Sequence, residues 1–446
     1  MKKQLLCGAA IRDITPPEEI IHGLRGLMGC KYGGVHDNLK VRAIAFDNGE
    51  TRAVIVQPDT DKDQSPVREL KYISERWNVP EENILYFGIH THSAPMHTGR
   101  HEMREDGMSE EELKEVLDCT HKYEELFFER MHEAIDEAFS NLKPCKIGVG
   151  KAQNYTNVRR VEDLKFYGAD GSLDHVFSTQ GSDPGAKVSH EMFVMRINDL
   201  EDNPIAFLIN FPMHCVVMFL NSLAPDGTNL ISGDVAGNVS QALERKFPGA
   251  VAAWSSGAAG DMNPLPSTFA AYVDPDTNEI GHMHLANLEV LNYIVANQFM
   301  SIMEAMNNIP YYSAKADIAG ALEYSKTPLF KRIIGENGRP VGITDEIDEK
   351  TFDVRMQTLR IGDVLLIGIG GELFNSFAEE LKALSPLRNT AVINHNLSLI
   401  SLVGYIHDDD AIARQYALFP GMGTNIVPGY LSASLREHFT NMLEKI

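Results

Sequence analysis

Short apolar runs typical of β-strands alternate along the chain with segments of helical periodicity, and this alternation limits the possible folds strongly. Three such runs occur within the first 90 residues, "VRAIAFDNG", "TRAVIVQPD" and "NILYFGIH". The amphipathic segment "SPVRELKYISERWN" lies between the second run and the third. Strands have a side-chain period of about two residues and amphipathic helices one of about 3.6. The pattern predicts an α/β (mixed α+β) fold, in which helices cover mixed β-sheets.

The same alternation continues to the end of the chain. Ser109, with Glu112 at the spacing of a capping box, predicts the start of a long helical region that runs with breaks towards Asn141. The irregular stretches 160–187 and 265–280 are predicted to be long functional loops or insertions. Further strands are predicted at 145–152, 190–198, 204–214, 351–362 and 363–371, and further helices at 237–247, 284–308, 372–384 and 431–446.

No internal repeat, low-complexity tract or long Pro/Gly/Ser linker divides the sequence. The chain has 446 residues, of which 43% are hydrophobic, and this is enough for a sizeable core. We therefore predict a single domain over residues 1–446. The sequence leaves open whether this domain forms a homo-oligomer.

The charge balance is strongly acidic, with 62 Asp and Glu residues against 40 Lys and Arg and a formal net charge of -22. Nucleic-acid binding depends on clustered basic residues, so nucleic acid is not expected as a partner.

Arg12 and Asp13 interrupt the N-terminal apolar run before a signal peptide is complete, and no later run reaches the roughly 18 residues of a membrane span. The five cysteines contain no CxxC pair. A soluble, cytoplasmic protein without a membrane span is predicted.

The stretch "YFGIHTHSAP" places His90 and His92 directly after an apolar run. In a strand, residues i and i+2 face the same side, so both rings are expected to project into one pocket beyond the strand end. Neutral imidazole is a common zinc ligand. The pair therefore indicates a metal site, although an HxH spacing by itself is also compatible with an incidental pair at a strand end.

Further candidate residues follow later strands. His214 ends the run "NFPMH", where a core or edge position is the alternative. The segment "IGIGGELF" resembles a dinucleotide loop, but Leu373 stands where the third glycine is required, so a Rossmann site is rejected. Glu372 remains as a carboxylate at a strand-to-helix junction. Tyr405 and Tyr416 occur in a late loop, where they either line a pocket or cover the edge of a core.

In their order, these motifs resemble the catalytic domain of the neutral (non-lysosomal) ceramidase family. The resemblance runs from about residue 5 to residue 420 and rests on "AAIRDITPP", "GVHDNLKVRAIAFDNG", "HTHSAP", "FPMHCVV", "ISGDVAGNVSQALE", "GAAGDMNP", "GGELF" and "GYIHDDDAIARQY". It implies a zinc ion (Zn2+) held by two histidines, a glutamate and a tyrosine, with a position left for water. By this resemblance the ligands are His90, His214, Glu372 and Tyr405.

The resemblance also implies roles for other side chains. His92 would lie beside the metal as a proton shuttle or a substrate contact. A family arginine that binds the reacting group corresponds to Arg159 or Arg160, and a second family tyrosine corresponds to Tyr416. The ceramidases carry a serine in their "GD-x-S-P-N" motif, where this chain has Asn263, which donates a hydrogen bond but cannot act as a nucleophile.

These residues predict a zinc hydrolase, in which a water with its pKa lowered towards about 7 attacks an amide and His92 moves the proton. Arg160, Tyr416 and Asn263 are the other predicted catalytic residues. The immunoglobulin-like C-terminal domain of ceramidases has no counterpart in the sequence, so a small soluble substrate, with hydroxyl-rich compounds among the options, is favoured over ceramide. An ester or lactone is a further option for the bond. Two alternatives remain: a metal-dependent amidohydrolase barrel, and a family member that binds a ligand without catalysis.

Overall fold

The computed structural model describes residues 3–61, 67–96, 108–266, 269–274, 276–277, 279–335, 340–397, 404–417 and 424–446. Its largest sheet has eight strands in the order β12-β10-β9-β6-β1-β3-β4-β5. The strands are β1 (Leu6–Asp13), β3 (Lys40–Asp47), β4 (Arg52–Pro58), β5 (Ile84–Tyr86), β6 (Lys143–Gln153), β9 (Glu191–Asp199), β10 (Pro204–Phe211) and β12 (Val251–Ser256).

This sheet consists of two halves joined at a corner. Strands β1 and β6 pair, antiparallel, only where Leu6 meets Pro144 and Cys7 meets Lys143. Both strands begin at this contact and run away from it. Because β12 of one half also lies against β3 and β4 of the other, the sheet is folded at the corner and its two halves run towards the same open end.

A second sheet packs against the folded one. It has four strands, β16 (Ile318–Ile334), β17 (Pro340–Ile361), β18 (Val364–Ile369) and β20 (Asn389–Ile393). Apolar side chains from both halves of the first sheet and from the second sheet meet in one core, which includes Phe46, Leu208 and Leu366. The residue before each of these three lies in a different core, on the opposite face of its strand.

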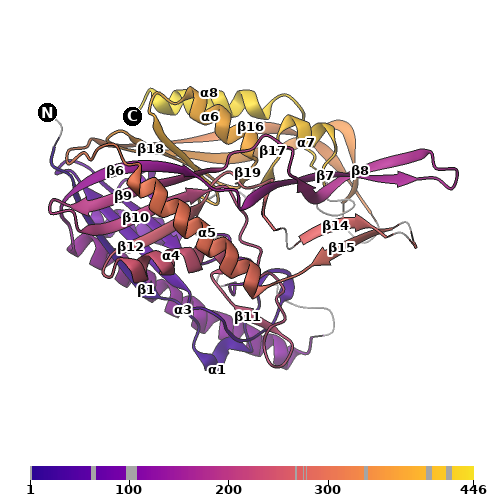
Figure 1. Ribbon diagram of the computed structural model, residues 1–446, viewed down its shortest axis with the longest axis horizontal. Helices are drawn as coiled ribbons and strands as arrows, with labels where there is room; N and C mark the ends of the chain where they lie inside the picture. The colour runs from indigo at the N-terminus through magenta and orange to yellow at the C-terminus, as the bar shows by residue number, and fades with distance from the viewer. Residues whose placement is uncertain are drawn as a thin grey trace.

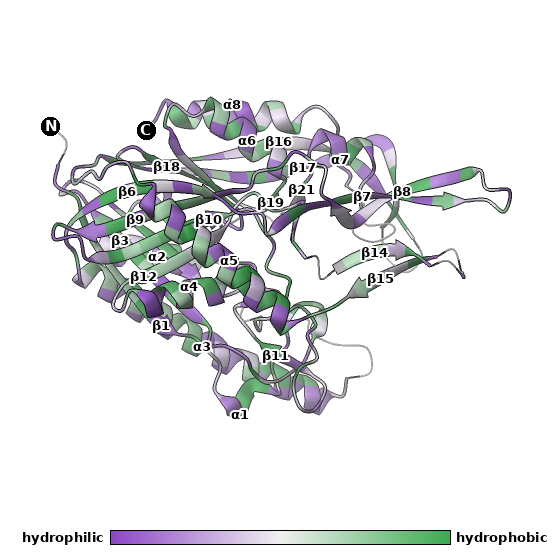
Figure 2. Cartoon of the chain, in the orientation of Figure 1, coloured by the Kyte–Doolittle hydropathy of each residue, from purple (hydrophilic) through white to green (hydrophobic). Residues whose placement is uncertain are grey.

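Amphipathic helices cover those opposite faces, and Figure 2 shows the apolar residues concentrated on the strands between them. In Figure 1, α8 and α6 lie along the top over the second sheet and α3 lies along the bottom. Helices α4 and α5 cover the half that contains β12 and β9. The helices are α2 (Val67–Trp77), α3 (Glu110–Ser140), α4 (Asp234–Lys246), α5 (Leu288–Asn307), α6 (Asn375–Leu384) and α8 (Leu431–Leu443).

The predicted mixed fold with covering helices is confirmed, and with it the start of the long helix. Ser109 and Glu112 form the capping box at the beginning of α3. That helix continues unbroken to Ser140, where breaks were expected. The described strands form open mixed sheets, so the alternative of an eightfold amidohydrolase barrel is wrong. That residues 1–446 form a single domain stays a prediction.

The stretch 160–187, expected to be a long loop or insertion, is mostly strand, so a loop is wrong there; in the stretch 265–280, Phe269–Val273 and Ile280 are strand. Strand β7 (Asn157–Tyr167) pairs with β8 (Leu173–Asp183) and with β13 (Met262–Pro264), and β14 (Phe269–Val273) pairs with β15 (Ile280–His284). Both hairpins project to the right in Figure 1. Because the far ends of β7 and β8 are largely exposed, their sequences lack the alternation that a half-buried strand requires.

Short elements complete the described chain, and none of the described helices is both long and apolar enough to cross a bilayer. The short elements are α1 (Glu18–Ile21), β2 (Tyr32–Val35), β11 (Asn229–Ile231), β19 (Glu372–Leu373), β21 (Tyr405–Ile406) and α7 (Asp409–Ala413), with single 3-10 turns at Leu27–Gly29 and Glu81–Asn83.

Three parallel strand pairs bring their C-terminal ends together at the open end of the fold. The pairs are β4 with β5, β10 with β12, and β18 with β20. Phe87, which follows β5, bridges to Asn396, which follows β20, and Thr91 bridges to Cys215 beyond β10. The loops after these strands therefore meet, as ligand-binding loops do at the carboxyl ends of parallel strands.

Candidate active site

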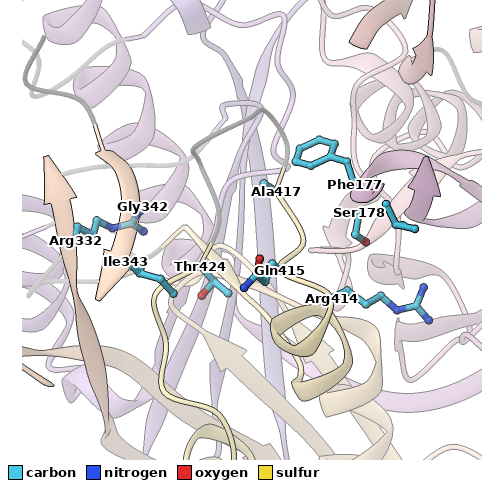
Figure 3. A pocket seen from close by; sticks show the side chains of 10 residues that line it. Phe177, Ser178, Arg332, Gly342, Ile343, Arg414, Gln415, Ala417 and Thr424 are labelled. Carbon is cyan, nitrogen blue, oxygen red and sulfur yellow. The ribbon is translucent and has the colours of Figure 1, made fainter. Parts of the chain in front are cut away.

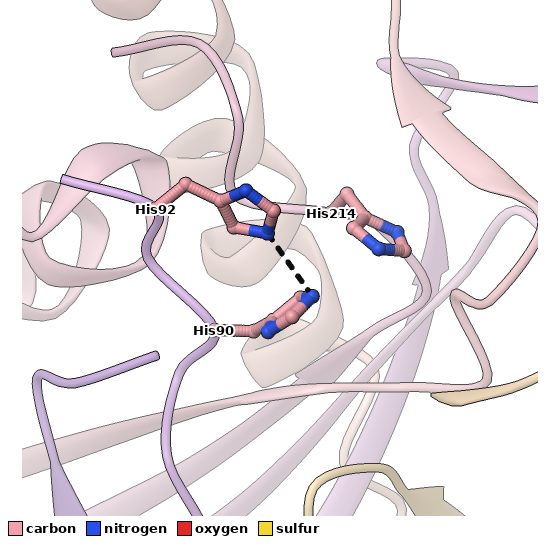
Figure 4. A group of neighbouring side chains, drawn as sticks. All are labelled: His90, His92 and His214. Carbon is pink, nitrogen blue, oxygen red and sulfur yellow. Dashed lines mark hydrogen bonds between the residues drawn. The ribbon is translucent and has the colours of Figure 1, made fainter. Parts of the chain in front are cut away.

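Three histidines from two of these loops face a common space, as Figure 4 shows. The Nε2 atom of His92 lies 3.2 Å from Nε2 of His90, and ligand atoms of His90, His92 and His214 all lie within 4.8 Å of one another. The proximity of His90 and His92 agrees with the prediction, but its cause differs. Strand β5 ends at Tyr86, and His90 has a φ of 62°, so the pair lies in a loop.

Glu372 brings a carboxylate to the same space. Its Oε2 atom lies 3.2 Å from Nε2 of His214 and 3.5 Å from Nε2 of His90. The side chain is almost fully buried, at the point where β19 follows β18. A buried carboxylate needs a compensating positive charge, which a cation or protonated imidazoles supply.

The other ring nitrogen of two histidines faces an acceptor. Nδ1 of His90 lies 2.6 Å from Oδ1 of Asp61, and Nδ1 of His214 lies 3.2 Å from the carbonyl oxygen of Met262. In the neutral imidazole, an acceptor at Nδ1 holds the proton there and leaves Nε2 with its lone pair directed towards Glu372. This carboxylate–histidine arrangement is typical of metal ligands.

The spacing of these atoms fits a divalent metal ion. Zinc binds nitrogen and oxygen ligands at about 2.0–2.1 Å in a tetrahedron, so two of its ligand atoms lie about 3.4 Å apart. The Oε2 atom of Glu372 lies at comparable distances, 3.2 Å from Nε2 of His214 and 3.5 Å from Nε2 of His90. Because a nitrogen and oxygen donor set accepts several divalent ions, the geometry favours a metal without selecting zinc among them.

Burial and nearby charges shift the pKa values of the two predicted histidine ligands in opposite directions. Burial lowers the pKa of His90, but Glu372 and Asp61 outweigh it and raise this pKa to about 9. Burial and the nearby Arg160 lower the pKa of His214 to about 3. A metal bound at His90 must therefore displace a proton held between the imidazole and the carboxylates.

Arg160, and not Arg159, faces the histidines. Arg160 donates from Nη2 to the carbonyl oxygen of Gly260 at 2.6 Å, and the same nitrogen lies 3.5 Å from Nε2 of His214. Its neighbour Arg159 points to the other side of β7 and pairs with Asp410 at 2.8 Å. Successive residues of a strand face opposite sides, so of the two arginines Arg160 faces the histidines, while its role in binding the reacting group stays a prediction.

The remaining predicted residues surround Arg160. Tyr405 lies opposite Glu372 in the parallel pair of β19 and β21, and the Arg160 guanidinium lies 4.9 Å from its ring centroid. Asn263, in β13, accepts from Nη1 of Arg160 at 3.4 Å. Tyr416 is fully buried, and within the described part of the chain its hydroxyl has no hydrogen-bond partner. The eight predicted residues thus occupy one region, while their roles stay predictions.

Residues 5–278 match the family described as neutral/alkaline non-lysosomal ceramidase, N-terminal. The chain belongs to this family. Neutral ceramidase A of Dictyostelium discoideum is 27% identical over 361 residues, which are 72% of this chain and 46% of that protein. Neutral ceramidase B of the same organism is 27% identical over 352 residues, or 71% of this chain and 45% of that one. The chain spans about half the length of the curated relatives it matches.

Two solved structures share the fold of this ceramidase-family chain. A neutral ceramidase from Pseudomonas aeruginosa has a TM-score of 0.67 and 17% identity, covering 99% of this chain and 74% of that one. A ceramidase complexed with C2 has a TM-score of 0.68 and 16% identity, covering 99% of this chain and 75% of that one. These comparisons confirm the predicted family and fold.

The sequence analysis did not identify three residues that lie near the site. Asp61 follows β4 and supports His90. The His395 ring stacks on the His90 ring with centroids 3.9 Å apart and planes at 19°. His407 lies with its ring centroid 5.8 Å from that of Tyr416. The available signal was weak: His395 follows the short apolar run "TAVIN", as His214 follows its own strand.

Proposed function

We propose that this chain is a metal-dependent hydrolase that cleaves the amide bond of an N-acyl substrate, with zinc as the expected ion. The convergence of His90, His214 and Glu372 on one space, with Asp61 behind His90, carries the proposal. The names of the relatives, neutral ceramidases, indicate the bond, because ceramide is an amide. A cytoplasmic location and a soluble rather than lipid substrate stay predictions.

In this proposal His90, His214 and Glu372 hold the metal, and Tyr405 is the fourth ligand. The bound ion would polarise the substrate carbonyl and lower the pKa of a water. His92 has its pKa lowered by burial, so its neutral imidazole can take a proton at Nε2 and return it to the leaving amine.

The positive charge of Arg160 stabilises negative charge on the carbonyl oxygen. Its guanidinium is fixed by Gly260, Gln180 and Asn263, so it needs no reorganisation during the reaction. The hydroxyl of Tyr416 is a second donor for that oxygen or for a polar substrate group. Asn263 contributes by orienting Arg160, since an amide cannot serve as the nucleophile.

Removal of the metal is the experiment that tests this proposal. We expect chelation to abolish hydrolysis of N-acyl amides and stoichiometric zinc to restore it, because the proposed mechanism needs the bound ion to polarise the carbonyl and to lower the pKa of the water. Metal content is measured by elemental mass spectrometry, and turnover on a panel of soluble and micellar N-acyl amides and esters. Full turnover by the metal-free protein would contradict the proposal, and metal binding without any turnover would favour the ligand-binding alternative.

The neighbouring arginines provide a matched pair of variants. Arg160→Lys is expected to lower kcat about tenfold to a hundredfold, because lysine cannot reproduce the planar set of donors that reaches Gly260 and Gln180. Arg159→Lys retains a charge beside Asp410 and is expected to keep kcat within about twofold. Steady-state kinetics decide the result, and equal losses in the two variants would refute the assignment of Arg160.

A further inference from the structure

The turn from Gly260 to Met262 joins two parts of the candidate site. The backbone N–H of Gly260 donates at 2.9 Å to the carbonyl oxygen of Leu373, the residue after Glu372. The carbonyl oxygen of Met262 accepts the backbone N–H of His214 at 3.0 Å. The turn therefore links the segment that carries Glu372 to the loop that carries His214.

The same turn holds Arg160 at two points. The carbonyl oxygen of Asp261 accepts the backbone N–H of Arg160 at 2.8 Å, and the carbonyl oxygen of Gly260 accepts from its Nη2 at 2.6 Å. A Cβ at position 260 would lie 2.2 Å from the carbonyl oxygen of Glu372, so only glycine allows this close approach. The position of Arg160 relative to Glu372 thus depends on where the turn lies.

The side chain of Asp261 attaches the turn to helix α6. It is 2% exposed, and its Oδ1 accepts the backbone N–H of Asn375 at 2.7 Å. Asn375 is the first residue of α6, and Phe374 before it provides no side-chain cap. A carboxylate at this point satisfies an N–H group that has no partner inside the helix, and the helix dipole favours its charge. Because α6 begins three residues after Glu372, Asp261 holds the end of the segment that carries Glu372.

Asn375 makes a second contact with the loop that contains this turn. Its Nδ2 donates to the carbonyl oxygen of Ala258 at 3.1 Å, and its Oδ1 accepts the backbone N–H of Ser189 at 2.8 Å. Asn375 is buried to the same extent as Asp261. Since each of these two side chains bonds to the segment of the other, the start of α6 and the turn cannot shift independently.

The charge of Asp261 is compensated on its other side. Its Oδ2 atom lies 3.3 Å from Nε of Arg159. Burial raises the pKa of Asp261 to about 6, and Asp408 acts in the same direction, whereas the N–H of Asn375 and the charge of Arg159 oppose the shift. At neutral pH the side chain is therefore ionised and accepts hydrogen bonds.

We propose that Asp261 is a positioning residue, which acts through the turn and α6 to hold Arg160 and Glu372 at a fixed separation. The role rests on the proposed function, in which Glu372 holds the metal and Arg160 stabilises charge on the carbonyl oxygen. The Asp261 carboxylate bonds to the backbone of α6 and pairs with Arg159, so it acts through other groups and not on the substrate. A displacement of about 1 Å is enough to lower the rate strongly when catalysis depends on preorganised groups.

Steady-state kinetics at saturating zinc and a zinc competition titration against a chromophoric chelator test the proposal on the full chain. Asp261→Ala and Asp261→Ser are both expected to lower kcat about tenfold to a hundredfold with KM within about threefold, because neither side chain reaches the N–H of Asn375. Zinc affinity should fall about tenfold through Glu372. Asp261→Asn keeps the shape of the side chain and an acceptor for this N–H, so kcat should stay within about threefold of the wild type.

Asp410→Asn is the matched control. Asp410 pairs with the same Arg159 at 2.8 Å, but its side chain is 47% exposed and also pairs with Arg414. Figure 3 shows Arg414 beside a pocket of about 390 Å³, and none of the predicted site residues lines this pocket. Loss of the Asp410 carboxylate is expected to leave kcat and zinc affinity within about twofold.

A double-mutant cycle separates positioning from a general loss of structure. In the Arg160→Lys background, Asp261→Ala is expected to lower kcat less than about threefold, because the group that it positions is already altered. Equal losses in the two backgrounds, or unchanged kcat and zinc affinity in Asp261→Ala, would overturn the proposal.

Failure of the proposed function gives a different result. If the wild type binds zinc without turnover, the proposed function fails and the titration decides the role of Asp261. A tenfold loss of zinc affinity in Asp261→Ala then supports its hold on Glu372, and equal affinities overturn it. A wild type that neither binds zinc nor hydrolyses an amide overturns both proposals.

Discussion

Glu372→Gln is expected to release the bound metal and to lower kcat/KM for N-acyl amide hydrolysis about a thousandfold. The substitution preserves the shape of the side chain but removes the charge from an oxygen that lies 3.2 Å from His214 Nε2 and 3.5 Å from His90 Nε2. A neutral amide is a poor ligand for a divalent ion, and loss of one preorganised charged group commonly costs about a hundredfold to a thousandfold in rate.

Two control variants separate a ligand from a supporting residue. Asp61→Asn is expected to weaken metal affinity only about tenfold to a hundredfold, because Asp61 acts through Nδ1 of His90. Glu379→Gln removes an exposed carboxylate of α6 that pairs with Lys382, and both metal content and rate should be unchanged. Elemental mass spectrometry and steady-state kinetics measure the series, and a fully metallated, fully active Glu372→Gln protein would exclude Glu372 as a ligand.

The limits of the sequence prediction have a common physical cause. Strands such as β10 and β18 were predictable because they are buried over almost their whole length and appear as nearly continuous apolar runs. The β7–β8 hairpin was not predictable from the sequence, because exposure of its far end removes the alternating pattern that identifies a half-buried strand. Periodicity reports burial, so a strand that is exposed on both faces gives no signal.

In the candidate site, too, some residues were predictable from the sequence and others were not. Spacing and family resemblance indicated His90, His214 and Glu372, each at or directly after the end of a predicted strand. Neither could indicate Asp61 or His395, because their contacts with His90 depend on which strand ends meet in space. Spacing predicted that two histidines would meet, but it assigned the geometry to a strand where the structure has a loop.

Arg42→Met is expected to lower the free energy of unfolding by about 3–5 kcal/mol, since it would leave a buried carboxylate without its partner. Arg42 and Asp59 have fully buried side chains, and Nη1 of Arg42 lies 2.8 Å from Oδ1 of Asp59. Nε of Arg42 also donates to Glu244 at 2.6 Å, which joins β3 to α4, the helix that covers the other half of the folded sheet. Chemical denaturation measures the loss.

Further variants distinguish an unpaired charge from lost packing. Arg52→Met, on the neighbouring strand, removes a side chain that is 39% exposed and pairs with Asp47, so less than about 1 kcal/mol should be lost. Adding Asp59→Leu to Arg42→Met should recover part of the stability, because the buried charge is then absent. Asp59 lies two residues before Asp61, so the unpaired charge is also expected to disturb the loop that supports His90. If Arg42→Met and Arg52→Met lower the free energy of unfolding equally, the buried pair contributes no more than a surface pair, and the contact between β3 and α4 depends on apolar packing alone.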